Sequence, residues 1–141
     1  MSSDTSFRLE KLATWQLSQA AARAHRVLHE RLAEEGASGY DYRILAALGD
    51  LGPASQADLG RAAALDRRDV THTVRDLHAR HLVTRRADPG DGRQMLVELT
   101  AAGRSMLARL DRVLDEVQAE VFGALTVAQR RTLLHLLQKL S

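Results

Sequence analysis

Residues 55–100 read SQADLGRAAALDRRDVTHTVRDLHARHLVTRRADPGDGRQMLVELT. Two short segments with apolar residues at helical spacing come first, and two short segments with the alternation typical of β-strands follow. A charged, glycine-rich stretch separates the two strand segments. Helix, helix, strand and strand in this order are the elements of a winged helix-turn-helix, so this stretch decides the predicted fold.

The two helices of this stretch each begin at a residue that commonly caps helices. Ser55 is a good N-cap, and Asp58 follows three residues later, an arrangement that resembles a capping box. Asp66 is the second N-cap and begins a predicted helix over residues 66–79. The apolar residues that recur on one face of this second helix are Val70, Val74 and Leu77.

The strand segments predict a β-hairpin wing over residues 83–98. Residues 82–86 form a short strand candidate, and residues 94–99 alternate as expected for its partner. Residues 88–92 between them read DPGDG, which is dense in turn-forming residues. We therefore expect a hairpin with a tip of five or six residues.

The flanking segments predict amphipathic helices. Residues 7–35 carry apolar residues at helical spacing and stop at Gly36, and residues 40–48 form a shorter helix. Two more helices are expected to begin at Thr100 and Thr126. The predicted fold class is therefore mainly α with a small β-hairpin wing: a winged helix-turn-helix plus a helical dimerisation domain.

The terminal helices carry more leucine and valine than one small winged domain can cover. Apolar surface of that extent normally meets a partner, and a homodimer with twofold symmetry is the simplest arrangement. We expect residues 1–36 and 100–141 to form the dimerisation region and residues 38–99 the winged helix-turn-helix. An intramolecular helical bundle is the alternative.

Composition narrows the function classes. The chain has 141 residues, a formal net charge of +2 and no cysteine, which excludes disulfides and thiol chemistry. Its N-terminus does not have the pattern of a secretory signal, and no apolar run approaches the ~20 residues that span a membrane. We expect a cytoplasmic protein that has no membrane partner.

Charge is sorted by position along the chain. From Arg67 to Arg93 there are seven arginines, four aspartates and no lysine, whereas the terminal segments hold most of the glutamates. This distribution is expected when one face of a protein meets phosphate, which makes double-stranded DNA the predicted partner. An ordinary solvated surface is the alternative.

The outward face of helix 66–79 carries basic and hydroxyl side chains that suit the edges of bases in a major groove. These base-contact candidates are Arg67, Arg68, Thr71, His72 and Arg75. Arg85, Arg86 and Arg93 are candidates for contact by the wing, although protection of a β-edge is the alternative for one of Arg85 and Arg86. Ser55 and Gln56 are candidates for phosphate contact at a helix N-terminus, with simple capping as the alternative.

Several of these stretches together resemble the MarR (multiple antibiotic resistance regulator) family of bacterial transcription factors. The most specific likeness is DPGDGR at residues 88–93, followed by Val97, Leu99 and Thr100, which is similar to the wing motif of the family. Residues 55–59, 65–67 and 82–83 are also similar to the family pattern. The likeness covers nearly the whole chain, and the order and spacing of these stretches make it specific.

The resemblance implies a homodimer whose winged domains bind inverted-repeat operators, usually to repress nearby promoters. It also implies release from DNA by a small phenolic or anionic ligand. It places Arg93 in or beside the minor groove, with Asp91 orienting that arginine through a charge-assisted hydrogen bond. The chain departs from the family at Asp69, where a serine or threonine is common, and at His72, where an arginine is common. We expect Asp69 to cap the helix or to pair with a nearby arginine.

Candidate ligand contacts lie in the first two helices. Trp15 is the only tryptophan and is accompanied by Gln19, so it is a candidate wall for a planar aromatic ligand, with packing in a dimer core as the alternative. Arg43 is a candidate charge partner for an anionic ligand. His25 and His29 have a spacing that can hold a metal, but no third ligand is evident nearby, so no metal and no cofactor is expected.

Nothing in the sequence supports catalysis. It has no phosphate-binding glycine loop and no nucleophile motif, and His29-Glu30 fails as the start of a zinc-hydrolase HExxH because the fifth position is Ala33. The predicted function is a homodimeric, sequence-specific DNA-binding regulator, most simply a ligand-released repressor, and not an enzyme. A winged-helix module that contacts proteins without sequence-specific DNA binding is the alternative.

Overall fold

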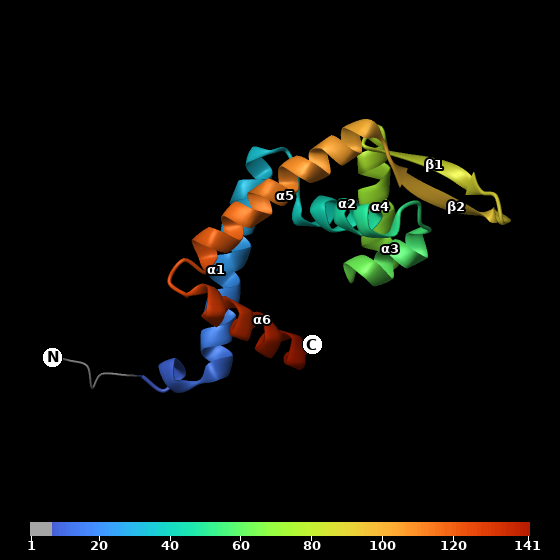
Figure 1. Cartoon of the computed structure of the whole chain (residues 1–141). Coiled ribbons are helices and arrows are strands. Elements are labelled where there is room, and N and C mark those ends of the chain that lie inside the picture. Colours follow the sequence, from blue (N-terminus) through green and yellow to red (C-terminus); the bar gives the residue numbers. More distant parts are fainter. Residues whose placement is uncertain (1–6) are drawn as a thin grey trace. The chain divides into compact units, whose positions relative to one another are not determined.

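The computed structural model describes residues 7–141. In chain order its elements are the 3-10 turn η1 (Leu9–Lys11), α1 (Ala13–Glu34), α2 (Gly39–Leu51), α3 (Gln56–Ala63), α4 (Arg67–Ala79), β1 (Val83–Asp88), β2 (Asp91–Leu99), α5 (Ala101–Val121) and α6 (Val127–Leu140) (Figure 1). This arrangement of helices with one antiparallel hairpin confirms the predicted fold class.

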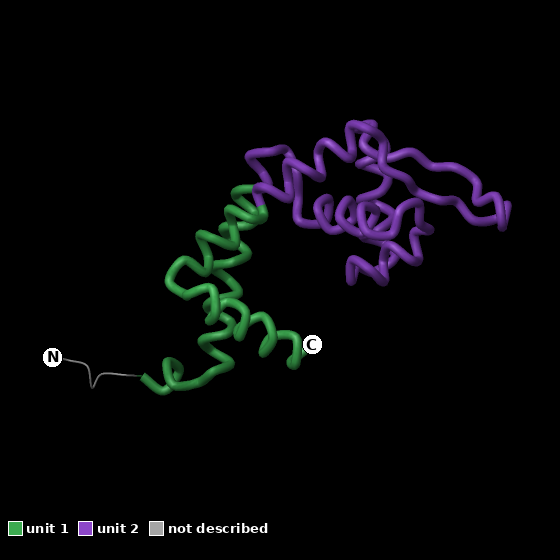
Figure 2. Tube along the Cα trace, in the orientation of Figure 1, with its two compact units in different colours: residues 1–31, 114–141 green, residues 32–113 purple. Residues whose placement is uncertain are grey.

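The chain divides into two compact units (Figure 2). Unit 1 consists of residues 1–31 and 114–141, and unit 2 of residues 32–113. The boundaries fall inside α1 and α5, so each of these long helices contributes to both units. The division predicted from the sequence, into dimerisation and DNA-binding regions, concerns function and stays a prediction.

Unit 2 has a continuous apolar core to which every helix and strand of the winged helix-turn-helix contributes. Its fully buried side chains are Leu32, Ile44, Leu45, Leu59, Val70, Val74, Leu77, Val83, Val97 and Leu110. The set includes the three apolar residues predicted for one face of the helix over residues 66–79. Because burial of such side chains is the main favourable term in folding, this core fixes α3, α4 and the wing relative to one another.

Caps determine where the helices of unit 2 begin. The Ser38 hydroxyl accepts from the backbone N–H of Asp41, and the Asp41 carboxylate accepts from the backbone N–H of Ser38, which is a full capping box at the start of α2. Ser55 accepts from the backbone N–H of Asp58 at the start of α3, without the reciprocal bond. Each such cap satisfies amide groups that have no partner within the helix.

The two strands of the wing run further toward its tip than the sequence predicted, and the turn between them is tighter. β1 and β2 pair in a regular antiparallel register from Val83↔Leu99 to Ala87↔Met95, and the next pair is Asp88↔Asp91. Three residues of β2 therefore bulge out opposite the bond between Ala87 and Asp88. The expected tip of five or six residues was wrong, because the Asp88 carboxylate accepts from the Gly90 amide at 2.8 Å and closes the turn locally.

The helix predicted over residues 7–35 begins later than expected. Leu12 has extended backbone angles (φ −93°, ψ 122°), so η1 ends there and α1 begins only at Ala13. The other end agrees with the prediction, since Gly36 lies just beyond α1 with φ +73°. Glycine adopts this left-handed conformation without steric cost, which makes it a common helix terminator.

In unit 1, arginines from two helices meet the C-terminal end of α5. Arg23 of α1 donates to the carbonyl of Val121 at 3.0 Å, and Arg130 of α6 donates to the carbonyl of Phe122 at 3.2 Å. Positive charge at this end of a helix satisfies unpaired carbonyls and interacts favourably with the helix dipole. These bonds connect α1, α5 and α6.

Candidate nucleic-acid interface

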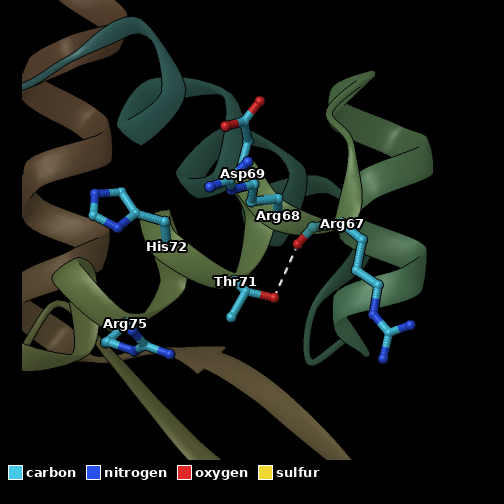
Figure 3. Close-up of a pocket in the computed structure, with 6 residues that line it drawn as sticks. All are labelled: Arg67, Arg68, Asp69, Thr71, His72 and Arg75. Carbon is cyan, nitrogen blue, oxygen red and sulfur yellow. Dashed lines mark hydrogen bonds between the residues drawn. The ribbon is translucent and has the colours of Figure 1, made fainter.

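The outer face of α4 presents five of the predicted DNA-contact residues. Asp66 fixes the start of α4, because its carboxylate accepts from the backbone N–H of Asp69 at 2.8 Å. With the apolar side of α4 buried in the core, the opposite side faces outward. An open pocket of about 740 Å³ on that side is lined by Arg67, Arg68, Asp69, Thr71, His72 and Arg75 (Figure 3).

This face of α4 is strongly basic. Arg67, Arg68, Arg75 and His72 are exposed, and Asp69 is the single carboxylate among the residues that line the pocket. Figure 3 shows the guanidinium groups of Arg67 and Arg75 extending to opposite sides of Thr71. Flexible guanidinium groups along an exposed helix are suited to phosphates and to the acceptor edge of guanine.

A second pocket, the helix–wing groove, joins the helix-turn-helix to the wing. Its volume is about 910 Å³. The groove is lined by Ser55, Gln56, Ala57, Gly60, Arg61, Leu65, Arg67, Val70, Thr71, Asp91, Arg93, Gln94 and Met95. It therefore brings together six predicted site residues from α3, α4 and β2 that are up to 38 positions apart in the sequence.

The bulge in β2 holds Arg93 in place through its backbone. The Asp91 carboxylate accepts from the backbone N–H of Arg93 at 3.1 Å. The resemblance implied that Asp91 orients Arg93. In the structure this bond reaches the main chain of Arg93, whose side chain is exposed, and orientation of its guanidinium by Asp91 stays a prediction. A carboxylate that accepts its neighbour's amide stabilises tight loop geometry of this kind.

The remaining predicted contacts differ in how far their side chains are already engaged. Ser55 is buried and uses its hydroxyl to cap α3, whereas Gln56 is half-buried and lines the groove. Arg86 forms an ion pair with Glu98 across the hairpin at 3.0 Å, and Arg85 is exposed. The structure thus gives Arg86 a role in holding the strands together, whereas contact of Arg85 and Arg86 with DNA stays a prediction.

The three predicted ligand contacts lie in different settings. Trp15 and Gln19 are both exposed on α1 in unit 1. Arg43 of unit 2 donates to the carbonyl of Ala63 at 2.9 and 2.7 Å and to the carbonyl of Ala64 at 2.8 Å. Its guanidinium therefore satisfies the C-terminal end of α3.

Seven residues of the groove were not predicted as contacts, and three of these have long side chains that are exposed or half-buried: Arg61, Gln94 and Met95. Arg61 is exposed on α3 five residues after Gln56, so helical spacing from the predicted contacts gave no signal for it. Gln94 and Met95 lie beside Arg93 on β2. No signal pointed to these two residues, because their place depends on the bulge in the hairpin register.

Within residues 7–141 no cluster of three or more His, Cys, Asp or Glu residues has the arrangement to hold a metal ion. No helix in the same range is long and apolar enough to cross a bilayer.

Comparison with known proteins places the chain among transcriptional regulators. The sequence model of the MarR family matches residues 35–94. The transcriptional repressor NicR of Pseudomonas putida is 32% identical over 124 residues, which are 88% of this chain and 78% of NicR. The chain therefore belongs to the MarR family and is a DNA-binding transcriptional regulator rather than an enzyme.

Solved structures have the same fold. A probable transcriptional regulator from Pseudomonas aeruginosa is 32% identical, with a TM-score of 0.85 over 95% of this chain and 100% of that protein. BpsR of Bordetella bronchiseptica, whose DNA binding is regulated by 6-hydroxynicotinic acid, is 27% identical, with a TM-score of 0.86 over 96% of each chain. These matches confirm the winged helix-turn-helix as the regulatory fold of this protein.

Proposed function

We propose that the protein is a homodimeric repressor that binds an inverted-repeat operator and leaves it when a small aromatic acid binds. In this proposal α4 enters the major groove, Arg93 at the wing contacts the neighbouring minor groove, and the N-terminus of α3 lies against the DNA backbone. The helix–wing groove carries the proposal, because it collects predicted contacts from three elements on one surface.

The charge and exposure of these residues support contact with a duplex. Arg61, Arg67 and Arg93 line the groove with a single carboxylate, Asp91. Arg68, His72 and Arg75 continue the basic surface along α4. DNA is densely anionic, so such a surface gains affinity from release of counterions as well as from direct hydrogen bonds.

The apolar surface of unit 1 supports a homodimer. Large apolar side chains of η1, α1 and α6 remain exposed there, including Leu9, Leu12, Leu17, Val127, Leu134, Leu136 and Leu140. Exposed apolar surface of this kind is typical of protein interfaces. Two copies related by a twofold axis would present two α4 helices to successive turns of a palindromic duplex, as dimeric helix-turn-helix proteins do.

The nature of the ligand is inferred from relatives and from Trp15. BpsR responds to 6-hydroxynicotinic acid, which is a planar aromatic carboxylic acid. Trp15 is partly exposed, at 37%, and offers a flat apolar surface to a ring of that kind. We therefore propose an aromatic acid as the effector, with Trp15 and Gln19 among its contacts. The guanidinium of Arg43, the third predicted ligand contact, is bonded to the carbonyls at the C-terminal end of α3.

Selection from a library of random DNA duplexes, followed by affinity measurements at several salt concentrations, tests the proposal. We expect an inverted repeat to be enriched and its affinity to fall steeply with salt. Arg93→Ala should weaken binding roughly tenfold for all sequences and lower the salt slope by about 1. Arg68→Ala and His72→Ala should instead change which bases are preferred, because direct contacts specify sequence.

Arg112→Ala is the matched control, since Arg112 is an exposed arginine on α5 outside both pockets. It should leave operator affinity unchanged within about twofold. Equal binding of random and palindromic DNA at physiological salt would overturn the repressor proposal and favour a module that contacts proteins. The same complex is then titrated with 6-hydroxynicotinic acid and related aromatic acids, and release of DNA together with quenching of Trp15 fluorescence is expected.

A further inference from the structure

The side chains of Thr71 and Gln56, which both line the helix–wing groove, are hydrogen-bonded to each other. The Thr71 Oγ1 lies 3.0 Å from the Gln56 Oε1 and 2.9 Å from the backbone carbonyl oxygen of Arg67. Both residues are only half-buried, and both line the groove. The dashed line in Figure 3 marks the bond from Thr71 to Arg67.

The Thr71 hydroxyl has one proton and two acceptors within reach. When that proton goes to Gln56, the carboxamide oxygen is occupied and the amide NH₂, with two donors, is left for the groove. When the proton goes to the Arg67 carbonyl, Oγ1 accepts from the NH₂ of a reversed carboxamide, and the amide oxygen is left instead. In either state the Thr71 proton is used within the protein, and the direction of the hydrogen bond between Thr71 and Gln56 decides which end of the carboxamide is left for the groove.

The surroundings of this pair select between the two states. Arg67 and Arg93 line the same groove against one carboxylate, Asp91, and a third arginine, Arg61, is paired with Asp58. The groove therefore has a net positive charge and attracts an anion. Gln56 is the first residue of α3, where unpaired backbone N–H groups also favour negative charge. A phosphate oxygen accepts hydrogen bonds and cannot donate them, so it stabilises the state in which the NH₂ of Gln56 faces outward.

We propose that Thr71 is a positioning residue that turns the Gln56 carboxamide so that its NH₂ donates to a phosphate oxygen of the DNA backbone. This assignment rests on the proposed DNA-binding function. It moves Thr71 from the base-contact candidates to a residue that acts through Gln56. Gln56 then fixes the register of α3 and α4 on the duplex without reading a base itself.

A double-mutant cycle on operator affinity tests the assignment. Thr71→Val removes the hydroxyl and keeps the shape of the side chain, and Gln56→Ala removes its partner. We expect each variant to weaken operator binding about fivefold to tenfold, and the double variant to weaken it by about the same factor, because both changes remove one shared contact. Thr71→Ser restores the hydroxyl and should recover most of the affinity.

Gln56→Glu tests whether this group faces phosphate. The glutamate still accepts from Thr71, but its second oxygen is anionic and faces the duplex, so we expect a larger loss than Gln56→Ala causes. The control is Thr132→Val, because Thr132 of α6 makes the same kind of bond to a carbonyl four residues earlier. Thermal unfolding of the free protein separates loss of positioning from loss of fold. Thr71→Val and Thr132→Val should both change the midpoint of unfolding by the same small amount.

The outcomes separate this inference from the proposed function. Additive losses in the cycle, or a glutamate variant that binds as tightly as the alanine variant, would overturn the role of Thr71 and Gln56 while wild-type operator binding stands. A change in base preference at one position for Thr71→Val alone would make Thr71 a base contact instead. If the wild-type protein selects no operator, the proposed function fails and this inference fails with it.

Discussion

At the scale of single residues, Gly103 is the position where close packing leaves no room for a side chain. A Cβ built there would lie 2.0 Å from the carbonyl oxygen of Leu82 and 3.1 Å from its carbonyl carbon, and both are backbone atoms. The N-terminus of α5 approaches this turn because Thr100 donates its amide to Leu82 at 3.1 Å and its hydroxyl to His81 at 2.8 Å. Gly103 therefore permits the junction between the wing and α5.

We expect Gly103→Ala to destabilise the protein by about 2–3 kcal/mol, because the backbone must separate and the gain in helix propensity, about 1 kcal/mol, does not offset this. Gly49→Ala is the matched control in α2. Its Cβ would meet only the side-chain Leu107 Cδ2, at 2.7 Å, which can rotate away. Urea unfolding of both variants checks this expectation. Equal stability of the two would show that the backbone at the junction between the wing and α5 can separate at little cost in free energy.

At the scale of elements, one arginine holds the C-terminal end of α4 against the start of α2. Arg80 donates to the Asp41 carboxylate at 2.9 Å, to Asp76 at 2.8 Å and to the carbonyl of Gly36 at 3.3 Å. Burial alone lowers the pKa of Arg80, but the charge and hydrogen bonds of Asp41, joined by Asp76, outweigh burial and raise it. The cation and its partners thus stabilise one another across three segments.

Asp41→Asn should cost about 2–3 kcal/mol of stability, somewhat less than a fully buried pair because the Arg80 side chain is 32% exposed. The variant should also weaken operator binding, since the position of α4 loses a tether to α2. Glu98→Gln, which breaks the more exposed pair with Arg86, is the control and should cost under about 1 kcal/mol. Chemical unfolding and operator affinity are the two measurements, and similar losses for the two variants would contradict a special role for Arg80.

The elements that the sequence predicted well are those set by local signals. Asp66 and Thr126 cap α4 and α6 as expected, because an N-cap acts on amides two or three residues away. The apolar face of α4 also follows directly from helical spacing. Tertiary contacts decided the rest: the three-residue bulge that carries Arg93 depends on hairpin pairing, and the partners of Asp41 and Arg43 lie 39 and 20 residues away.

The same distinction applies to the candidate site. The residue types on α4 and on the wing predicted four of the side chains that line the helix–wing groove, because helical spacing and turn residues place them on exposed faces. The bond between Thr71 and Gln56 could not be read from the sequence. It joins residues 15 positions apart and depends on the packing of α3 against α4. Specific hydrogen bonds across a groove require the folded geometry of both helices.

At the scale of the whole molecule, the proposed homodimer would make the stability of unit 1 depend on association, because its large apolar side chains are exposed in the single chain. If two copies bury Leu134, Leu136 and Leu140 of α6 against each other, the unfolding midpoint must rise with protein concentration, since dimerisation stabilises only the folded state. Leu136→Glu should abolish that dependence and yield a monomer in sedimentation equilibrium. It should also lose operator binding, because a monomer has one α4 and contacts only one half-site.

His135→Glu, which places the same charge on a neighbouring exposed polar position of α6, is the control and should remain dimeric. A wild-type midpoint independent of concentration, with a monomeric mass at micromolar protein, would show that unit 1 is stable with its apolar side chains in water and would remove the basis for a twofold operator complex.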